Sequence, residues 1–163
     1  MTTALPPRQR DGAGVRFPPP LLYAVPLGIG YFLQRTWPMA LVPHSAERAA
    51  ETAGVVLLVA WLALMLSAFG LFRRAGTNII PNRPTTAIVV AGPYRFTRNP
   101  MYVSMTLGYI GACLFGNTLW PLIFLPFILV AVRRLVIDRE EQYLERKFGD
   151  EYRAYCARVR RWL

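Results

Sequence analysis

Residue types that commonly carry enzyme chemistry are scarce in this sequence. Its 163 residues include one histidine, His44, and two cysteines, Cys113 and Cys156. Two cysteines cannot form a disulfide framework, and no cluster of Cys, His and Asp has metal-ligand spacing. No serine lies in a nucleophile-elbow context, and no glycine-rich loop resembles a phosphate cradle. The sequence therefore gives poor support to hydrolysis by zinc or by a triad, and we expect no bound metal.

Lysine and acidic residues are also scarce. Lys147 is the single lysine, and nine acidic residues face 19 basic ones, for a formal net charge of +10. A chain without a lysine-rich tail is not expected to bind nucleic acid. Most of the arginines instead lie beside apolar runs, where the anionic headgroups of membrane lipids are the simpler partners.

What is abundant is apolar sequence, in long runs without charge. Three such windows cover Phe17 to Gln34, Thr52 to Phe72 and Asn99 to Val132, with 18, 21 and 34 residues. About 20 residues are needed to cross a bilayer as a helix. The third window is interrupted by a turn signal at 116–118, so it predicts two helices, Met101 to Phe115 and Leu119 to Val132. We therefore predict an all-α integral membrane fold with four transmembrane helices.

The positions of the cations predict the orientation of these spans. With both termini in the cytoplasm, 17 Lys and Arg residues lie inside and two, Arg35 and Arg48, lie outside. Such a bias is the feature that most strongly sets topology. We expect an integral protein of a bacterial inner membrane or an ER-like membrane, with both termini cytoplasmic.

The ends of the chain carry their own signals. Neither Pro nor Gly interrupts 127–148, so the fourth span is predicted to continue as a cytosolic helix that stops at Gly149. Asp150 is predicted to cap a last amphipathic helix, with Tyr152, Tyr155, Val159 and Trp162 on one face. That helix reads as a membrane-surface anchor or as a lid over a site. The chain is treated as a single domain, 1–163, with residues 1–15 expected to be disordered.

The connection between the second and third spans, 75–102, is unusually specific in its choice of residues. An extended apolar run from Thr85 to Val90 precedes a turn, and Asn99-Pro100 opens the third span as N-cap and first helical residue. A helix N-terminus favours an anion such as a carboxylate, and the neighbouring Arg98 could pair with it. Alternatively, Asn99-Pro100 is only a cap and Arg98 only a membrane anchor.

A second unusual feature is the acidic pair Glu140-Glu141. No cation lies three or four positions from either residue on a helix, and Glu141 faces two like charges. Glu140 falls on the apolar stripe, so it needs a partner elsewhere in the protein or on a ligand. A basic loop residue such as Arg95 or Arg98 is one candidate; a ligand with an amine, hydroxyls or a cation is the other.

Three stretches resemble a known family. AGTN at 75–78, GPYRFTRNPMY at 92–102 and EEQYLERKFGDEYRAY at 140–155 resemble the C-terminal block of isoprenylcysteine carboxyl methyltransferases. The NPMY and the paired glutamates are also similar to phosphatidylethanolamine N-methyltransferase. The resemblance covers about 75–163 and implies a membrane methyltransferase that uses S-adenosyl-L-methionine and a lipid-like or small hydrophobic acceptor.

The resemblance also implies site residues. It places Glu140 near the methyl acceptor, with Glu141 supporting the site, and Arg98 completes the candidate catalytic set. The cofactor-binding residues carried over are Thr86, Ala87, Ile88, Val89, Tyr94, Asn99, Pro100, Met101 and Tyr102. Asn99 replaces the family's usual His, so a titrating role there is not expected. Val136 stands where carboxyl methyltransferases have an arginine. The resemblance therefore supports methyl transfer more strongly than it supports a prenylcysteine carboxylate as the acceptor.

Two other functions fit parts of the pattern. A membrane reductase of the sterol-reductase type would use the basic loop to hold the phosphates of NADPH. A non-catalytic membrane scaffold would use its arginine-rich face to bind anionic lipid, and Glu140 would then be dispensable. The sequence names neither the methyl acceptor nor the oligomeric state.

Overall fold

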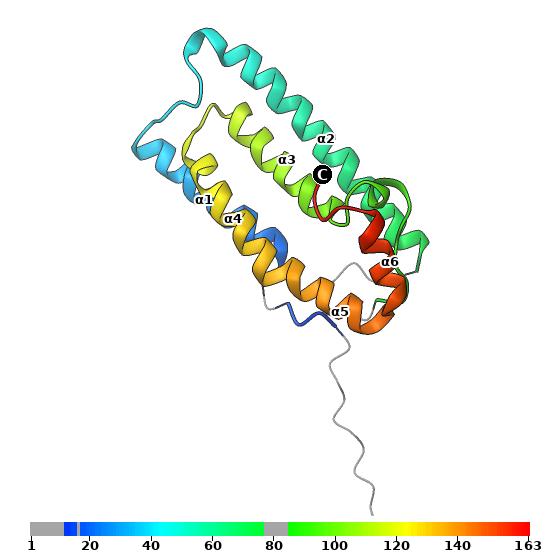
Figure 1. The fold of residues 1–163 in the computed structure, drawn as a ribbon. Helices are drawn as coiled ribbons and strands as arrows, with labels where there is room; N and C mark the ends of the chain where they lie inside the picture. Colours follow the sequence, from blue (N-terminus) through cyan, green and yellow to red (C-terminus); the bar gives the residue numbers. More distant parts are fainter. Residues whose placement is uncertain (1–11, 16, 77–84) are drawn as a thin grey trace, which may run out of the picture.

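The computed structural model describes residues 12–15, 17–76 and 85–163, and these form helices joined by irregular segments (Figure 1). No β-strand occurs in this described part; the backbones of Thr97 and Arg160 form an isolated parallel bridge. The elements in chain order are α1 Pro19–Thr36, η1 His44–Ala46, α2 Glu47–Arg74, η2 Gly92–Arg95, α3 Pro100–Phe115, α4 Trp120–Val132, η3 Arg133–Ile137, α5 Asp138–Phe148 and α6 Asp150–Arg158.

Each of the four apolar segments expected from the sequence is a helix. α1 continues through Pro26, while α2 extends beyond its apolar window to Glu47 and Arg74. Two helices, 44–74 and 120–148, are long and apolar enough to cross a membrane, and α3 is apolar but shorter. The all-α fold is thus confirmed in the described residues, and the count of four spans stays a prediction.

The apolar helices present their hydrophobic side chains outward. Only 6% of the most apolar window of 44–74 is buried, so α2 is not the core helix of a soluble protein. Val59 and Leu66 on α2, Phe32 on α1 and Phe127 on α4 are all more than 60% exposed. Apolar surface of this extent requires an apolar environment, and the bilayer supplies one.

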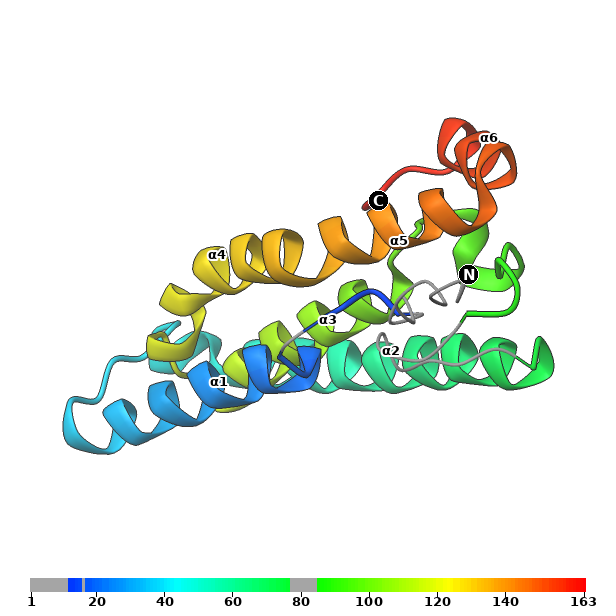
Figure 2. The ribbon, with the colours of Figure 1, turned by 90° about the horizontal axis from the view of Figure 1, so that it is seen from below.

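The four helices lie side by side and give the molecule two distinct ends (Figures 1 and 2). One end holds the α1–α2 connection and the tight turn between α3 and α4. The other holds the segment before α3, the extension α5, and α6. The C-terminal residues return to the start of α3, where the Arg98 amide donates to the Arg160 carbonyl at 2.9 Å.

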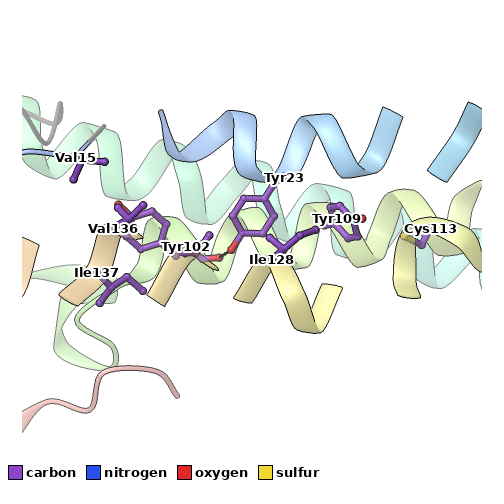
Figure 3. Close-up of a cluster of buried hydrophobic side chains, with 9 residues drawn as sticks. Val15, Tyr23, Tyr102, Tyr109, Cys113, Ile128, Val136 and Ile137 are labelled. Atoms are coloured by element: carbon purple, nitrogen blue, oxygen red, sulfur yellow. Dashed lines mark hydrogen bonds between the residues drawn. The ribbon is translucent and has the colours of Figure 1, made fainter. Parts of the chain in front are cut away.

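Close approach of the helices depends on glycine. A Cβ at Gly30 of α1 would lie 2.5 Å from Pro121 of α4, and one at Gly54 of α2 would lie 2.6 Å from the Phe115 backbone. Small residues at such crossings let helices pack in an apolar solvent, where no hydrophobic force draws them together. Between them lies a core that includes Tyr23, Tyr109 and Val136 (Figure 3).

The helix of the fourth apolar segment continues beyond that segment, as expected from the sequence. α4, η3 and α5 form one continuous helix, 120–148, with a five-residue stretch of wider π-helical winding at Arg133–Ile137. Gly149 ends it with a φ of +54°, a conformation that favours glycine. Seven of the eleven residues of α5 are charged, so α5 lies beyond the apolar part of this helix.

Three details of the chain ends differ from expectation. Gly149, not Asp150, precedes α6, and the Asp150 carboxylate instead pairs with Arg153 at 2.7 Å. α6 ends at Arg158 because Val159 is extended, so Val159 and Trp162 do not continue its face. Val15, at the end of the stretch expected to be disordered, is buried, and the Arg139 side chain donates to the Gly14 carbonyl at 3.0 Å. Residues 1–11 lie outside the described part.

Candidate functional site

A cavity lies where the N-terminus of α3 meets α5 and α6. Its volume is about 130 Å³. The residues that line it are Ala13, Phe72, Thr85, Ala87, Ile88, Val89, Tyr94, Arg98, Asn99, Pro100, Met101, Tyr102, Glu140, Glu141, Tyr143, Leu144, Tyr152 and Tyr155. Segments distant in sequence thus converge on one space.

Most residues singled out from the sequence line this cavity. The three candidate catalytic residues do so, as do eight of the nine candidate cofactor-binding residues. The exception is Thr86, which is exposed. Its hydroxyl donates to the Gly76 carbonyl at 3.3 Å. Thr77 and Asn78 of the AGTN stretch lie outside the described residues.

Glu140 has its partner on α3. The Tyr102 hydroxyl donates to both carboxylate oxygens, at 2.9 Å to Oε1 and 3.0 Å to Oε2. The expectation that Glu140 needs a partner from outside its own helix is confirmed, but the candidate basic partner is wrong. Burial raises the pKa of Glu140 to about 7, the Tyr102 hydrogen bond opposes the rise, and the charge of Glu141 adds to it. A carboxyl group with this pKa exchanges protons near neutral pH.

Glu141 receives the cations that Glu140 lacks. Arg161 lies in the C-terminal tail, residues 159–163. Its Nε–H donates to Glu141 Oε1 at 3.2 Å and its Nη2–H donates to Oε2, so the contact has two prongs. Arg98 Nη2 lies 3.5 Å from the same Oε1, and Arg161 Nη1 lies 3.1 Å from Asp138 Oδ1. The side chains of Arg98 and Glu141 are each only 16% exposed. The tail therefore neutralises the acidic side of the site.

Arg98 retains an unused donor. Its Nε is buried and has no hydrogen-bond partner. Among the buried side-chain atoms of the described residues, Thr118 Oγ1 is the other atom without a partner. A buried N–H left without an acceptor is costly. Because Arg98 also lines the cavity, an anionic ligand there could supply that acceptor.

The side chain of Asn99 does not cap α3, contrary to expectation. α3 begins after Asn99 without a side-chain cap bond. Instead, Nδ2 donates to the Arg161 carbonyl at 2.9 Å, and the Thr97 hydroxyl donates to the same oxygen at 3.1 Å. The amide thus ties the C-terminal tail to the start of α3, a role for which an uncharged donor suffices.

Aromatic side chains form much of the remaining wall. The Tyr155 hydroxyl donates to the Tyr94 carbonyl at 2.8 Å, which joins α6 to η2. The rings of Phe72 and Tyr94 lie 5.5 Å apart. Tyr152 and Tyr155 of α6 are buried and line the cavity. Placing α6 over the site favours the lid interpretation of this helix over that of a surface anchor.

Sequence reasoning missed Arg161, which binds Glu141 from outside the cavity, and several residues of the cavity wall. Arg161 is one of many arginines near the C-terminus, and no local pattern distinguishes it from Arg158 or Arg160. Tyr143 falls on the buried side of α5 one turn after Glu140, and this spacing could have revealed it. Ala13 and Phe72 come from segments that only the folded chain brings here.

Comparison with known proteins gives the site a family. The model of the phospholipid methyltransferase family matches residues 49–151. An uncharacterized protein of Haemophilus influenzae is 52% identical over 64 residues, which are 39% of this chain and the whole of that protein. No solved structure matches. The family match covers more than half of the chain and includes α3, both glutamates and the start of α6, so this chain belongs to the phospholipid methyltransferase family.

Proposed function

We propose that this membrane methyltransferase takes the methyl group from S-adenosyl-L-methionine and transfers it to a lipid-like or small hydrophobic acceptor at the cytoplasmic edge of the membrane. The observation that carries the proposal is that one cavity is lined both by Arg98, which has an unused buried donor, and by Glu140, which has a carboxylate. S-adenosyl-L-methionine has a carboxylate, an amine and a sulfonium, so its charges match this arrangement.

The residues of the cavity fit the methyl donor by chemistry. Arg98 Nε would bind the donor's carboxylate, and the first turn of α3 favours the same anion. Tyr94 and Tyr102 present aromatic surface beside the acidic side of the cavity, which suits a purine and a sulfonium cation. The donor, when bound, supplies an activated methyl group whose transfer needs alignment and exclusion of water more than an activated side chain.

Glu140 would orient the acceptor. In the transfer, the bond between the methyl carbon and sulfur breaks while a bond to the acceptor atom forms. If the attacked atom carries a proton, the Glu140 carboxylate accepts it, and the pKa of about 7 suits this task. The Tyr102 hydroxyl holds both oxygens of this carboxylate in place.

Size and surroundings indicate how the ligands enter. The cavity of about 130 Å³ is smaller than the roughly 300–1,000 Å³ of pockets that hold drug-sized ligands, so donor binding requires its walls to move apart. α6 is the simplest moving part, since it is short and lies over the site. A hydrophobic acceptor would enter from the bilayer that surrounds the exposed apolar helices.

The cytoplasmic placement is supported by charge. The cavity end holds η2 and the start of α3, with Arg95 and Arg98, and the arginines of α5 and α6. Arg35, in the last turn of α1, and Arg48, in the first turn of α2, lie at the opposite end. The positive-inside bias supports a cytoplasmic position for the cavity end and for both termini. Labelling of single cysteines placed at position 39 and in α6, in sealed vesicles, tests this orientation.

Calorimetry on the full chain in detergent micelles tests whether the cavity binds the proposed methyl donor. We expect S-adenosylhomocysteine to bind with micromolar affinity and NADPH to show no heat of binding. Well-folded protein that binds NADPH but not S-adenosylhomocysteine would overturn the proposal and favour the reductase. Transfer of radiolabelled methyl from S-adenosyl-L-methionine into fractionated lipid extract then identifies the acceptor class.

A further inference from the structure

Arg161 and Arg98 compete for one carboxylate, and the geometry of that competition has a functional consequence. Arg161 contacts both oxygens of Glu141, whereas Arg98 reaches Oε1 alone, at 3.5 Å. A two-pronged arginine–carboxylate contact is stronger and more directional than a single long one. Arg161 thus holds most of the hydrogen-bonding capacity of Glu141.

We propose that Arg161 is a positioning residue, which occupies Glu141 so that the guanidinium of Arg98 stays available to the carboxylate of the methyl donor. The inference rests on the proposed function. Arg161 acts through Glu141 and Arg98, and it does not line the cavity itself. The C-terminal tail is thereby part of the binding site.

The way the tail is anchored makes this role separable from folding. The backbone carbonyl of Arg161 accepts hydrogen bonds from Thr97 and Asn99, and the Arg160 carbonyl accepts one from the Arg98 amide. These bonds do not involve the Arg161 side chain. Truncating that side chain therefore leaves the tail attached to the start of α3.

Loss of the Arg161 guanidinium changes what surrounds Arg98. Glu141 would lose its two-pronged partner, and Arg98 is the nearest remaining cation. A largely buried carboxylate draws in the cation that remains, because an unpaired buried charge is costly. Arg98 would then turn its donors to Glu141 and away from the cavity.

The test is a double-mutant cycle read by calorimetry with S-adenosylhomocysteine. Arg161→Ala is expected to raise its Kd about 10-fold. Adding Glu141→Gln removes the competing charge, so the double variant should recover most of the wild-type affinity. A residue that only stabilised the fold would show no such recovery. Arg158→Ala, which removes an exposed arginine from the end of α6, just before the tail, is the matched control.

A second ligand sharpens the test. 5′-Methylthioadenosine lacks the amino-acid carboxylate, so its affinity should be the same in wild type and Arg161→Ala. Unchanged S-adenosylhomocysteine affinity in Arg161→Ala, or equal losses for both ligands, would overturn the role of Arg161 while leaving the proposed function intact. Failure of the wild-type protein to bind S-adenosylhomocysteine would instead overturn the proposed function.

Discussion

The two ends of the helix bundle each hold a prominent polar side chain, and the protein uses the hydrogen-bonding groups of these two side chains differently. At the turn between α3 and α4, the Asn117 side chain accepts hydrogen bonds from the amides of Leu41 and Val42, at 3.0 and 2.9 Å. Its Nδ2 donates to the Val42 carbonyl at 3.2 Å and to Glu47 at 3.0 Å. At the cavity end, Arg98 Nε has no partner.

This contrast separates a structural cluster from a binding site. A polar group whose whole hydrogen-bonding capacity is used by the protein fixes the fold and has little left for a ligand. A buried group with unused capacity destabilises the empty protein, and a ligand can relieve that cost. The Asn117 side chain therefore holds the helices together, whereas the charged donor of Arg98 lies at a cavity where a ligand can accept from it. Thr118 Oγ1, beside Asn117, is also buried without a partner, but it carries no charge and does not line that cavity.

The sharpest test of the cavity end is Glu140→Gln. The substitution keeps the shape and the Tyr102 contact but removes the charge that orients the acceptor. We expect methyl transfer to fall about 1,000-fold, within the usual range for loss of a positioned acid or base. The melting temperature in detergent serves as the folding control, and turnover close to wild type would favour a non-catalytic role.

Asn117→Ala tests the other half of the comparison. It removes four hydrogen bonds and leaves Ala at a φ of +40°, which side chains with a Cβ disfavour. We expect the free energy of unfolding to fall by about 3 kcal/mol. The affinity for the methyl donor should be unchanged in the protein that remains folded. Chemical denaturation in micelles measures the first quantity, and calorimetry the second. A large loss of donor affinity would abolish the distinction between the two ends.

Arg98→Gln addresses the unused donor itself. Loss of a charge-assisted hydrogen bond of about 2 kcal/mol should weaken binding of S-adenosylhomocysteine about 30-fold. Binding of 5′-methylthioadenosine, which has no carboxylate, should change less than 3-fold. Equal weakening of both ligands would mean that Arg98 maintains the cavity rather than binding a carboxylate.

The raised pKa of Glu140 predicts a graded effect of pH on the free energy of unfolding. Its pKa is about 7 in the folded protein against an ordinary 4.5, so between these values the folded state keeps a proton that the unfolded state has released. Wild-type stability should therefore fall with rising pH, relative to Glu140→Gln, by about 1.4 kcal/mol per pH unit. Below pH 4.5 the difference should be constant. Denaturation curves of both proteins in micelles from pH 4 to 8 measure it, and parallel curves would contradict the burial of this carboxyl.

Much of the fold is readable from the sequence because its signals are local. The charge-free windows, the turn at Asn117 and the stop at Gly149 all mark helices that the structure contains. Predictions that required side-chain partners did less well. Asp150 and Asn99 are good capping residues by type, yet neither side chain caps a helix. The Asp150 carboxylate pairs with Arg153, and the Asn99 amide donates to the Arg161 carbonyl.

The sequence by itself determined the helices, their apolar surfaces and the acidic pair that lacks a local cation, because each depends on residues within a few turns of one another. Only the tertiary structure decided how that pair is divided. Tyr102 donates a hydrogen bond to Glu140, whereas Arg98 and Arg161 pair with Glu141. The reason is physical: these partners come from α3 and from the C-terminal tail, and hydrogen bonds between them depend on ångström-scale placement that no spacing along the chain encodes.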